Sequence, residues 1–382
     1  MPERRVLVTG ARGFIGSNLA LRMRELGFDI DGFDVDDDPA SLPARVRAAT
    51  AVVHLAGVNR PQDPQEFTEG NAGLTARVCA AIEAAGGTIP LVMVSSAYAA
   101  RADEPGLGAL HRAYGQSKRE AERAAEALAQ RPGASVRIYR LPGVFGKWCR
   151  PAYNSVVATF CHNAAHGLPL EVRDPAAPLQ LVYVDDVVEA FLAALAAAEP
   201  GCRYAEVTPE YAVTLGELAA LITGFQRSRQ DLVVDRVGAG FARALYATYV
   251  SYLPPASFSY RVPTHGDARG MFAELVKTVD SGQFSVFTAH PGITRGGHYH
   301  HTKAEKFIVV RGRARFRFRH VVTGAEHALE TGGAVPEVVE TVPGWAHDIT
   351  NIGDDEMIVL LWANERFDPA RPDTVAAPLG TV

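Results

Sequence analysis

Hydrophobic and polar positions in the N-terminal part of the chain follow two alternating periodicities. Short runs rich in β-branched residues predict buried strands at Val6–Thr9, Ile30–Val35, Ala51–Leu55, Pro90–Ser95 and Val136–Leu141. Between them, helical periodicity predicts helices at Asn18–Leu26, Gly73–Ala85 and Ser117–Ala129. Because strands that alternate with helices form right-handed βαβ units, the pattern predicts an α/β fold with a doubly wound, mainly parallel sheet.

The pattern changes after Ala244. The segment Tyr246–Tyr260 is rich in Tyr, Ser and Pro, and Pro254-Pro255 stops any helix, so we expect a linker there. Beyond it, alternation predicts short strands at Glu274–Val279, Gln283–Ala289, Lys306–Arg311, Ala314–His320, Glu337–Val342 and Met357–Asn364. Such spacing is typical of an all-β sandwich or barrel. We therefore expect domains at residues 1–245 and 263–382, joined by a linker at 246–262.

Length and composition agree with two globular domains in a reducing compartment. A chain of 382 residues exceeds the usual size of one domain. A formal net charge of −5 predicts no binding to nucleic acid or to an anionic membrane surface. The four cysteines form no Cys-x-x-Cys pair, which argues against a disulfide framework or a thiolate zinc site. Met1 leads directly into a strand pattern, and the Ala-rich run Val187–Ala198 is too short to span a bilayer, so we expect a cytoplasmic protein.

Directly after the first predicted strand comes the turn Thr9-Gly10-Ala11-Arg12-Gly13-Phe14-Ile15-Gly16. Glycines three apart let the backbone approach a pyrophosphate, and the helix N-terminus that follows offers N–H donors and a positive dipole. Turn glycines of this spacing also occur by chance, but their position at the first strand–helix junction favours a Rossmann-type dinucleotide site. We expect Gly10, Gly13 and Gly16 to bind the cofactor, with Arg12, Phe14 and Ile15 beside them.

Two further stretches accompany the glycine turn: His54-Leu55-Ala56-Gly57, and Ser95-Ser96 followed by Tyr114-Gly115-Gln116-Ser117-Lys118. With them the sequence resembles the extended short-chain dehydrogenase/reductase family. The resemblance implies that Leu55, Ala56 and Gly57 lie along the adenine and ribose of the cofactor. It also implies that Ser96, Tyr114 and Lys118 form the catalytic set.

The chemistry of that set explains its spacing. Residues four apart share one face of a helix, so Tyr114 and Lys118 project into the same cleft. A lysine ammonium beside a phenol would lower the phenol pKa toward working pH, and Tyr114 could then protonate a carbonyl oxygen as hydride arrives. Ser96 would hold that oxygen, and Lys118 would also bind the ribose hydroxyls. Without the glycine turn, an ordinary solvated i,i+4 pair would explain the two residues equally well.

The sequence leaves the dinucleotide open between NADPH and NADH. Asp34 ends the second predicted strand, where a carboxylate binds a ribose 2′-OH and repels a 2′-phosphate. Arg12, inside the glycine turn, could instead pair with a 2′-phosphate. Further along, Arg140 and Lys147 could bind diphosphate, although surface charge is the default explanation for both.

The β-rich part contains Gly297-His298-Tyr299-His300-His301-Thr302-Lys303-Ala304-Glu305 and, later, Pro343-Gly344-Trp345-Ala346-His347. Alternation in a strand puts His298 and His300 on one face, while Glu305 and His347 could return from neighbouring strands. Three imidazoles and one carboxylate suit Zn²⁺, and Ni²⁺, Mn²⁺ or Fe²⁺ would also fit. The two blocks resemble the paired motifs of the cupin family, a jelly-roll barrel whose metal positions fall on these four residues. A metal-free polar pocket and a purely structural zinc remain alternatives.

The whole chain resembles the bacterial capsular-polysaccharide synthesis enzymes of the CapF (WbjC) type, which join these two domains. Long non-catalytic stretches carry this resemblance, among them Val58-Asn59-Arg60-Pro61, Phe145-Gly146-Lys147-Trp148-Cys149 and Ser251-Tyr252-Leu253-Pro254. It implies that the cupin epimerises C3 of a UDP-linked 2-acetamido-2,6-dideoxy-4-keto hexose. The reductase then reduces C4 with NADPH, giving UDP-N-acetyl-6-deoxy-L-talosamine for N-acetyl-L-fucosamine synthesis. Tyr299, His301 and Lys303 are candidates for the base that takes the C3 proton, and the family is associated with homodimers.

Two other functions remain open from the sequence. The chain could be a nucleotide-sugar reductase alone, with a cupin that serves assembly or stability. It could also be a redox-sensing protein that binds the dinucleotide without turnover, although a sensor has no need of the proton donor that Tyr114 provides.

Overall fold

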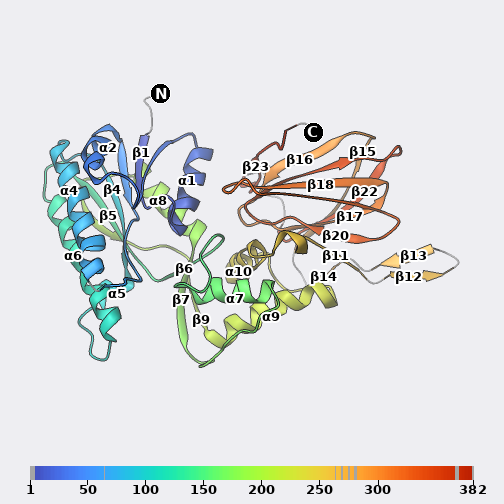
Figure 1. Ribbon diagram of the computed structural model, residues 1–382, viewed down its shortest axis with the longest axis horizontal. Helices are drawn as coiled ribbons and strands as arrows, with labels where there is room; N and C mark the ends of the chain where they lie inside the picture. Colours follow the sequence, from blue (N-terminus) through green and yellow to red (C-terminus); the bar gives the residue numbers. More distant parts are fainter. Residues whose placement is uncertain are drawn as a thin grey trace. The chain divides into compact units, whose positions relative to one another are not determined.

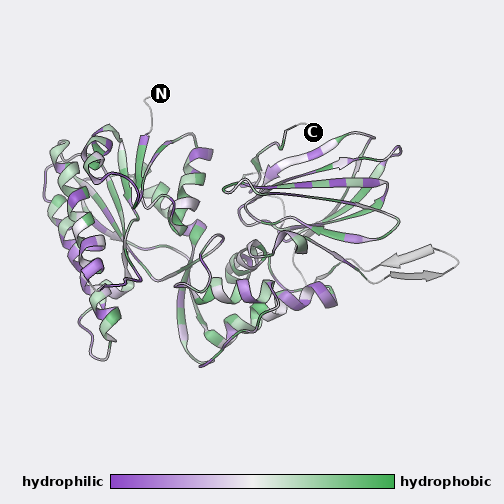
Figure 2. Cartoon of the chain, viewed as in Figure 1, coloured by the Kyte–Doolittle hydropathy of each residue, from purple (hydrophilic) through white to green (hydrophobic). Residues whose placement is uncertain are grey.

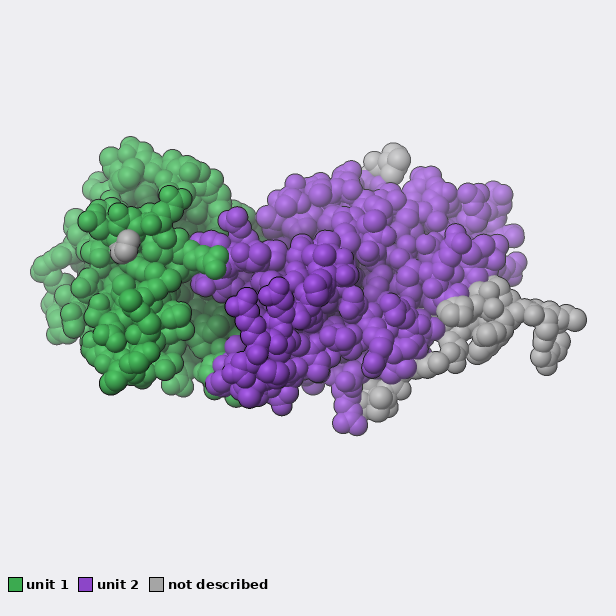
Figure 3. Space-filling model, turned by 60° about the horizontal axis from the view of Figure 1, so that its bottom comes forward, with its two compact units in different colours: residues 1–144, 180–212 green, residues 145–179, 213–382 purple. Residues whose placement is uncertain are grey.

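The structure is a computed structural model that describes residues 5–63, 65–262, 264–267, 270–273, 276–278, 282–365 and 370–380. The chain forms two compact units: Met1–Val144 with Gln180–Ala212, and Phe145–Leu179 with Val213–Val382 (Figure 3). These packing units differ from the predicted division at 1–245, 246–262 and 263–382, which remains a prediction about functional domains.

The first unit is built on a six-stranded parallel sheet of order β2-β1-β3-β4-β5-β8 (Figure 1). Its strands are β1 (Arg5–Thr9), β2 (Asp29–Phe33), β3 (Ala51–His54), β4 (Leu91–Ser96), β5 (Ser135–Leu141) and β8 (Gly201–Ala205). The longer helices are α1 (Phe14–Glu25), α2 (Leu42–Ala48), α4 (Leu74–Ala84), α6 (Ala109–Leu128) and α8 (Val184–Ala196). The shorter ones are η1 (Pro39–Ser41), α3 (Gln65–Phe67), the π-helix η2 (Thr68–Gly73) and α5 (Ala97–Ala100). The predicted doubly wound α/β fold is therefore confirmed.

Hydrophobic side chains cover both faces of this sheet. On one face, Val46, Val78 and Ala125 from α2, α4 and α6 pack against the strands in one buried cluster. On the other face, Leu19 of α1 and Phe191 of α8 belong to a second cluster. Helix α6 carries both polar and apolar residues along its length (Figure 2), as expected for a helix with one face on the sheet and one in solvent. Strands β1, β3, β4 and β5 are largely buried because helices lie on both sides of them, whereas the edge strand β2 is only partly buried.

The chain passes between the units within a small sheet of order β6-β7-β9, formed by β6 (Gly143–Phe145), β7 (Pro178–Tyr183) and β9 (Glu210–Thr214). The second unit contains α7 (Val156–Ala165), α9 (Leu215–Asp231), α10 (Gly240–Ser251) and η3 (Pro255–Ser257). The segment predicted as a linker therefore begins inside α10, where Tyr246 and Tyr249 are buried. These two tyrosines pack on the buried face of α10, and the helix ends before Pro254, as expected.

The β-rich part of the second unit has two five-stranded sheets within the described residues. The first has the order β11-β20-β17-β22-β15, with β11 (Ser259–Arg261), β15 (Gln283–Ala289), β17 (Glu305–Arg311), β20 (Glu337–Glu340) and β22 (Met357–Ala363). The second has the order β19-β18-β21-β16-β23, with β16 (Thr294–Tyr299), β18 (Arg313–His320), β19 (Glu326–Gly332), β21 (Trp345–Asn351) and β23 (Val375–Ala376). Two smaller pairs join β12 (Thr264–Asp267) to β13 (Gly270–Ala273), and β10 (Val233–Val234) to β14 (Lys277–Thr278).

This arrangement confirms the predicted all-β barrel in the C-terminal part. Much of the strand predicted at Glu274–Val279 lies outside the described residues. Apolar alternation alone did not predict β16, β19 and β21, because polar residues interrupt it; strands that carry His298 and His347, as β16 and β21 do, were expected only from the spacing of the metal ligands. Among the described residues, no helix is both long and apolar enough to cross a membrane.

Candidate active site and metal centre

The glycine turn lies between the end of β1 and the start of α1. Gly10 has φ of +70°, which side chains rarely adopt, and a Cβ there would lie 2.9 Å from the backbone N of Ala56. A Cβ on Gly16 would lie 2.0 Å from the carbonyl O of Gly10. Gly13 caps α1 and brings no side chain to its N-terminus. The turn thus brings backbone close to backbone at the open end of a helix, the geometry that a pyrophosphate needs.

Arg12 and Asp34 form an ion pair at the end of β2. The backbone N–H of Arg12 donates to Asp34 Oδ1 at 3.1 Å, and the Arg12 Nε lies 3.3 Å from Oδ2. The Arg12 guanidinium also donates to Asp36 at 2.7 Å, while its side chain stays mostly exposed. The two residues on which cofactor choice was predicted to depend therefore contact each other. Asp34 lies just after the strand rather than within it.

A hollow of about 290 Å³ opens beside Asp34. Its wall combines the end of β2 with the loop after β3 and with α4, and includes Phe33, Val35, Ala56, Gly57 and Arg77. The predicted loop residues Ala56 and Gly57 thus share one hollow with Asp34. A largely apolar hollow with a carboxylate at its wall suits an adenosine group.

Ser96, Tyr114 and Lys118 come together at the end of β4 and on α6. Tyr114 and Ser96 share a side-chain hydrogen bond, and Ser96 also accepts from the backbone of Tyr98 at 3.2 Å. Lys118 is buried and donates from Nζ to the carbonyl O of Val94 at 3.2 Å. Burial lowers the pKa of Lys118 to about 8, and the charge of Glu122 opposes that shift.

The predicted lowering of the Tyr114 pKa is wrong for the cofactor-free chain. Burial raises the pKa of Tyr114, and the hydrogen bond from Ser96 only partly opposes it. Loss of water around the buried phenol disfavours the phenolate, an effect that residue spacing does not reveal. Between Ser96 and Tyr114 the chain contains α5 and the first residues of α6.

Asn71 is a site residue that the sequence did not reveal. It lies in the π-helix η2, a rare element that is frequent at functional sites. Its Nδ2 donates to Ser117 Oγ at 3.0 Å and to the carbonyl O of Val58, and its Oδ1 accepts from the N–H of Val58. A Cβ on Gly57 would lie 2.6 Å from Asn71 Oδ1 and 3.1 Å from Lys118 Nζ. Asn71 therefore joins the cofactor loop to the helix that carries Tyr114 and Lys118.

His54 extends this connection to the glycine turn. Thr75 Oγ1 donates its one proton to the carbonyl O of Asn71 at 2.8 Å, so His54 Nε2 must donate to Thr75 Oγ1, at 2.9 Å. Nδ1 then accepts from Thr9 Oγ1 at 2.7 Å, and Thr9 Oγ1 accepts from the N–H of Ala56. Burial, helped by the charge of Lys118, lowers the pKa of His54 to about 3. The ring is thus neutral, with its proton on Nε2.

Arg140 does not face a ligand as one sequence hypothesis supposed. Its guanidinium makes a bidentate contact with the buried carboxylate of Glu122, at 2.8 and 2.7 Å. Ser95 donates to the same carboxylate at 2.6 Å, and Arg119 donates at 2.9 Å. Glu122 follows Lys118 by one helical turn, so this network fixes α6 against the sheet beside the candidate catalytic residues. Lys147 is buried rather than a surface charge.

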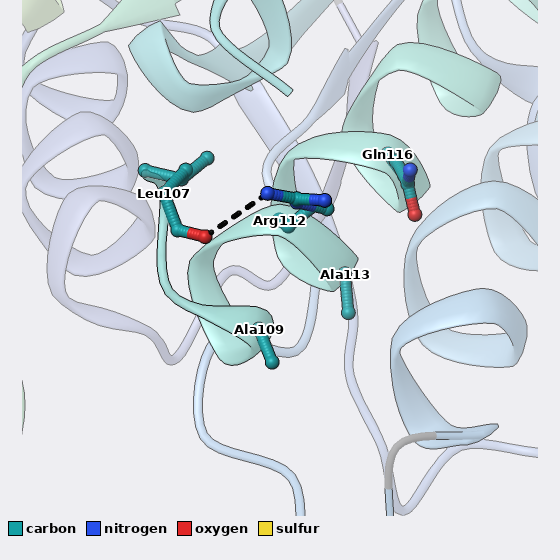
Figure 4. A pocket seen from close by; sticks show the side chains of 5 residues that line it. All are labelled: Leu107, Ala109, Arg112, Ala113 and Gln116. Atoms are coloured by element: carbon teal, nitrogen blue, oxygen red, sulfur yellow. Dashed lines mark hydrogen bonds between the residues drawn. The ribbon is translucent and has the colours of Figure 1, made fainter. Parts of the chain in front are cut away.

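A second hollow, of about 360 Å³, lies on α6 and is not part of this site (Figure 4). Leu107, Ala109, Arg112, Ala113 and Gln116 line it, and Arg112 donates to the carbonyl O of Leu107 at 3.3 Å. On a helix these positions lie on the side opposite Lys118.

In the second unit, His298, His300, Glu305 and His347 offer ligand atoms that all lie within 4.8 Å of one another. His298 lies in β16, Glu305 in β17 and His347 in β21, whereas His300, predicted to share a strand with His298, lies in the turn directly after β16. His300 Nε2 lies 3.1 Å from Glu305 Oε2, and His347 Nε2 lies 3.5 Å from the same oxygen. The structure therefore brings the whole predicted ligand set together.

The hydrogen bonds around the rings indicate that these residues fit a cation. His300 Nδ1 faces the carbonyl O of Asp373 at 2.5 Å, and His347 Nδ1 faces the carbonyl O of Trp345 at 3.4 Å. A carbonyl only accepts, so each ring donates from Nδ1 and has Nε2, the nitrogen that faces Glu305, available as the ligand atom for a cation. Within the described part of the chain, the buried His347 Nε2 has no hydrogen-bond partner. Lone pairs and a carboxylate that face each other in this way are the donor set of a metal centre.

Of the three candidate bases, Lys303 places its side chain close to a predicted ligand. Its Nζ is 3.9 Å from Glu305 Oε1 and donates to Thr374 Oγ1 at 3.2 Å. Tyr299 alternates with His298 and His300 along the chain, which turns its side chain to the other face of the strand.

Two protein families match the sequence. Residues 6–205 match the NAD dependent epimerase/dehydratase family, and residues 265–375 match the polysaccharide biosynthesis C-terminal domain. The chain is 49% identical over 377 residues to UDP-2-acetamido-2,6-beta-L-arabino-hexul-4-ose reductase of Pseudomonas aeruginosa, covering 98% of this chain and 99% of that protein.

Solved structures agree with this similarity. The capsular polysaccharide assembling protein CapF from Staphylococcus aureus is 38% identical, with a TM-score of 0.65, and the match covers 98% of this chain and 100% of that chain. MoeE5 in complex with UDP-glucose and NAD is 26% identical, with a TM-score of 0.50, over 58% of this chain and 81% of that chain.

Proposed function

This chain belongs to the NAD dependent epimerase/dehydratase family, among its CapF-type members, and we propose from that premise that it is a bifunctional nucleotide-sugar enzyme. Its substrate is a UDP-linked 2-acetamido-2,6-dideoxy-4-hexulose. The barrel epimerises C3, and the Rossmann-type domain then reduces the C4 ketone with NADPH, giving UDP-N-acetyl-6-deoxy-L-talosamine for capsule or O-antigen synthesis. The observation that carries the reductase part is the convergence of Ser96, Tyr114 and Lys118 beside the glycine turn.

The residues of the first unit suit this reduction. Bound NADPH would supply the hydride that C4 of the sugar receives. Tyr114 would donate its phenolic proton to the ketone oxygen, which Ser96 would hold by a hydrogen bond. The oxygen gains the proton and C4 gains the hydride, so the ketone becomes an alcohol. Lys118, buried beside Gly57, would bind the ribose and stabilise the phenolate that remains on Tyr114.

The residues of the barrel suit the epimerisation. A divalent cation, zinc by our expectation, would stabilise the enediolate formed when a proton leaves the carbon next to the ketone. His298, His300, Glu305 and His347 would hold it. Lys303 is our candidate for the group that takes the proton from C3, and the proton must return to the opposite face of that carbon.

One incubation tests both activities. The purified chain is given the UDP-4-keto-6-deoxy-HexNAc substrate in D₂O with NADPH, with NADH, or with neither, and the products are followed by NMR. We expect deuterium at C3 without a nicotinamide cofactor, and reduction at C4 only when one is added. Reduction without deuterium at C3 would mean a reductase with a structural barrel. Binding of the cofactor without either reaction would favour a redox sensor.

We propose further that the enzyme acts in the cytoplasm as a homodimer. The four cysteines are free thiols in the structure, in keeping with a reducing compartment. Sedimentation equilibrium of the purified chain would reveal its oligomeric state, and a monomer would refute the homodimer.

A further inference from the structure

The last described residues of the chain, 370–380, form a C-terminal tail that contacts the predicted metal loop. The carboxylate of Asp373 accepts from the backbone N–H groups of His301 at 2.9 Å, Thr302 at 2.8 Å and Lys303 at 2.8 Å. It also accepts from Thr302 Oγ1 at 2.9 Å. One carboxylate therefore fixes three successive residues of the turn between His300 and Glu305.

The backbone of Asp373 contacts a predicted ligand directly. Its carbonyl O accepts from His300 Nδ1 at 2.5 Å, which holds the proton on Nδ1 and leaves Nε2 for the cation. Asp373 has φ of +36°, a left-handed conformation that few residues other than Gly, Asn and Asp adopt readily. In this conformation the carbonyl of Asp373 contacts His300 while its carboxylate accepts from the N–H groups of residues 301–303.

The rest of the tail is fastened to the sheet that carries the ligands. Strand β23 pairs with β16, with Ala376 opposite His298, and Ala377 N–H donates to the carbonyl O of Gly297 at 2.7 Å. Farther along, Arg317 and Arg319 donate to the carbonyl oxygens of Gly380 and Pro378. These contacts leave Asp373 little freedom to move away from His300.

We propose that Asp373 is a positioning residue of the metal centre and that the C-terminal tail sets the metal affinity of the barrel. Asp373 orients His300 and the 301–303 turn, which also carries the candidate base Lys303. This inference rests on the proposed metal centre. A tail that only completes the sheet would contribute to stability and leave metal binding unchanged.

The test compares Asp373→Asn with the wild-type chain by two measurements on zinc-free protein. Asparagine also adopts the left-handed backbone readily. However, its side chain is neutral and has one acceptor oxygen in place of two, so it cannot accept all the hydrogen bonds that the Asp373 carboxylate accepts. Competition with a chromophoric chelator gives the zinc dissociation constant, which we expect to rise about 10- to 100-fold, as for other residues that orient metal ligands. Hydrogen exchange of the amides of residues 301–303 should become faster. Asp354→Asn, an exposed carboxylate of the same unit, is the matched control.

The outcomes separate the two proposals. Zinc that does not bind the wild-type chain would overturn the metal centre, and the inference with it. If Asp373→Asn binds zinc as tightly as the wild-type chain does, although amide exchange at residues 301–303 is faster, only the role of Asp373 is overturned. A fall in thermal stability would not change that conclusion. Thr302→Val removes one donor to Asp373 while keeping the side-chain shape, and a smaller loss of zinc affinity there would support the inference independently.

Discussion

Arg12 contacts Asp34 twice, through its backbone N–H at 3.1 Å and through its guanidinium at 3.3 Å. A carboxylate that already holds a cation repels a phosphate less than a free one. The same guanidinium, mostly exposed, can turn toward a ribose 2′-phosphate. The pair therefore makes the proposed use of NADPH compatible with an acidic residue directly after β2.

Replacing Arg12 by Ala should weaken NADPH much more than NADH. Loss of a charge-assisted hydrogen bond and exposure of the Asp34 carboxylate should raise the NADPH dissociation constant by about 10-fold or more. Asp34→Asn should have the opposite selectivity and weaken NADH. Fluorescence titration with both nucleotides gives the four constants, with Arg24→Ala, an exposed arginine of α1, as control. Equal losses for the two nucleotides in Arg12→Ala would refute the role of Arg12 in selection.

The pH dependence of reduction should report Lys118. Its pKa is about 8, because burial disfavours the ammonium, so Lys118 loses its charge as pH rises through that value. We expect kcat/KM for reduction to fall on the alkaline side accordingly. Glu122→Gln removes the negative charge that raises this pKa, and should move the alkaline limb to lower pH. Glu126→Gln, which removes a more exposed carboxylate of the same helix, should leave the limb near its wild-type position.

Gly16→Ala should abolish tight cofactor binding. The added Cβ would lie 2.0 Å from the backbone of Gly10, so the glycine turn must move, and a flexible side chain cannot absorb the change. Calorimetric titration with NADPH should show an affinity at least about 10-fold weaker, which corresponds to about 1.4 kcal/mol. Gly224→Ala is the matched control, because nothing lies within 4 Å of its Cβ and alanine favours a helix. A Gly16→Ala chain that binds NADPH as wild type does would show that the turn does not hold the cofactor.

His54→Leu should weaken cofactor binding indirectly, because His54 holds the loop after β3 and the glycine turn together. Leucine removes the acceptor of the buried Thr9 hydroxyl and one donor to Thr75, while their bonds to Ala56 and Asn71 remain; the unsatisfied Thr9 donor should cost about 1–3 kcal/mol. His54→Asn keeps an acceptor near Thr9 and should lose less affinity. Long-range ¹H–¹⁵N spectra of the wild-type chain should show a neutral ring protonated on Nε2 throughout the neutral pH range, because its pKa is about 3. If the His54 ring titrated near neutral pH, the assignment of a neutral ring protonated on Nε2 would be wrong.

The sequence predicted the parallel sheet because the inner strands β1, β3 and β4 are short apolar runs separated by helical segments, whereas the polar edge strand β8 gave no such pattern. It also selected Ser96, Tyr114 and Lys118 and the four predicted metal ligands, which the structure brings together and whose roles remain predictions, because spacings within a helix or strand carry that information. Asn71 gave no such signal, since its importance comes from a π-helix that no periodicity marks. The pairing of Arg140 with Glu122 was equally hidden, because β5 and α6 meet only in the folded chain.

The contacts of the C-terminal tail were also hidden in the sequence, because they join residues about 70 positions apart. Asp373 stands in an ordinary stretch, Arg371-Pro372-Asp373-Thr374, and nothing in its surroundings distinguishes it from a surface carboxylate. Its contacts with the turn 301–303 exist only because β23 pairs with β16. Residues that position ligands are found through the fold, whereas the ligands themselves follow from their chemistry and spacing.

Glu305→Gln should abolish the effect of zinc on stability. Without zinc, the Glu305 carboxylate lies 3.1 and 3.5 Å from Nε2 of His300 and His347, and these imidazoles favour its charged form despite its burial. A glutamine amide can still share a hydrogen bond with one of those nitrogens, but it is a poor ligand for zinc. Thermal unfolding with and without zinc measures the effect. At a zinc concentration about 100 times its dissociation constant, the wild-type chain should gain about 2.7 kcal/mol, and Glu305→Gln should gain almost none. Glu356→Gln, an exposed carboxylate of the same unit, should behave as wild type. A wild-type chain that zinc does not stabilise, or a Glu305→Gln chain that zinc stabilises fully, would contradict a metal centre at these four residues.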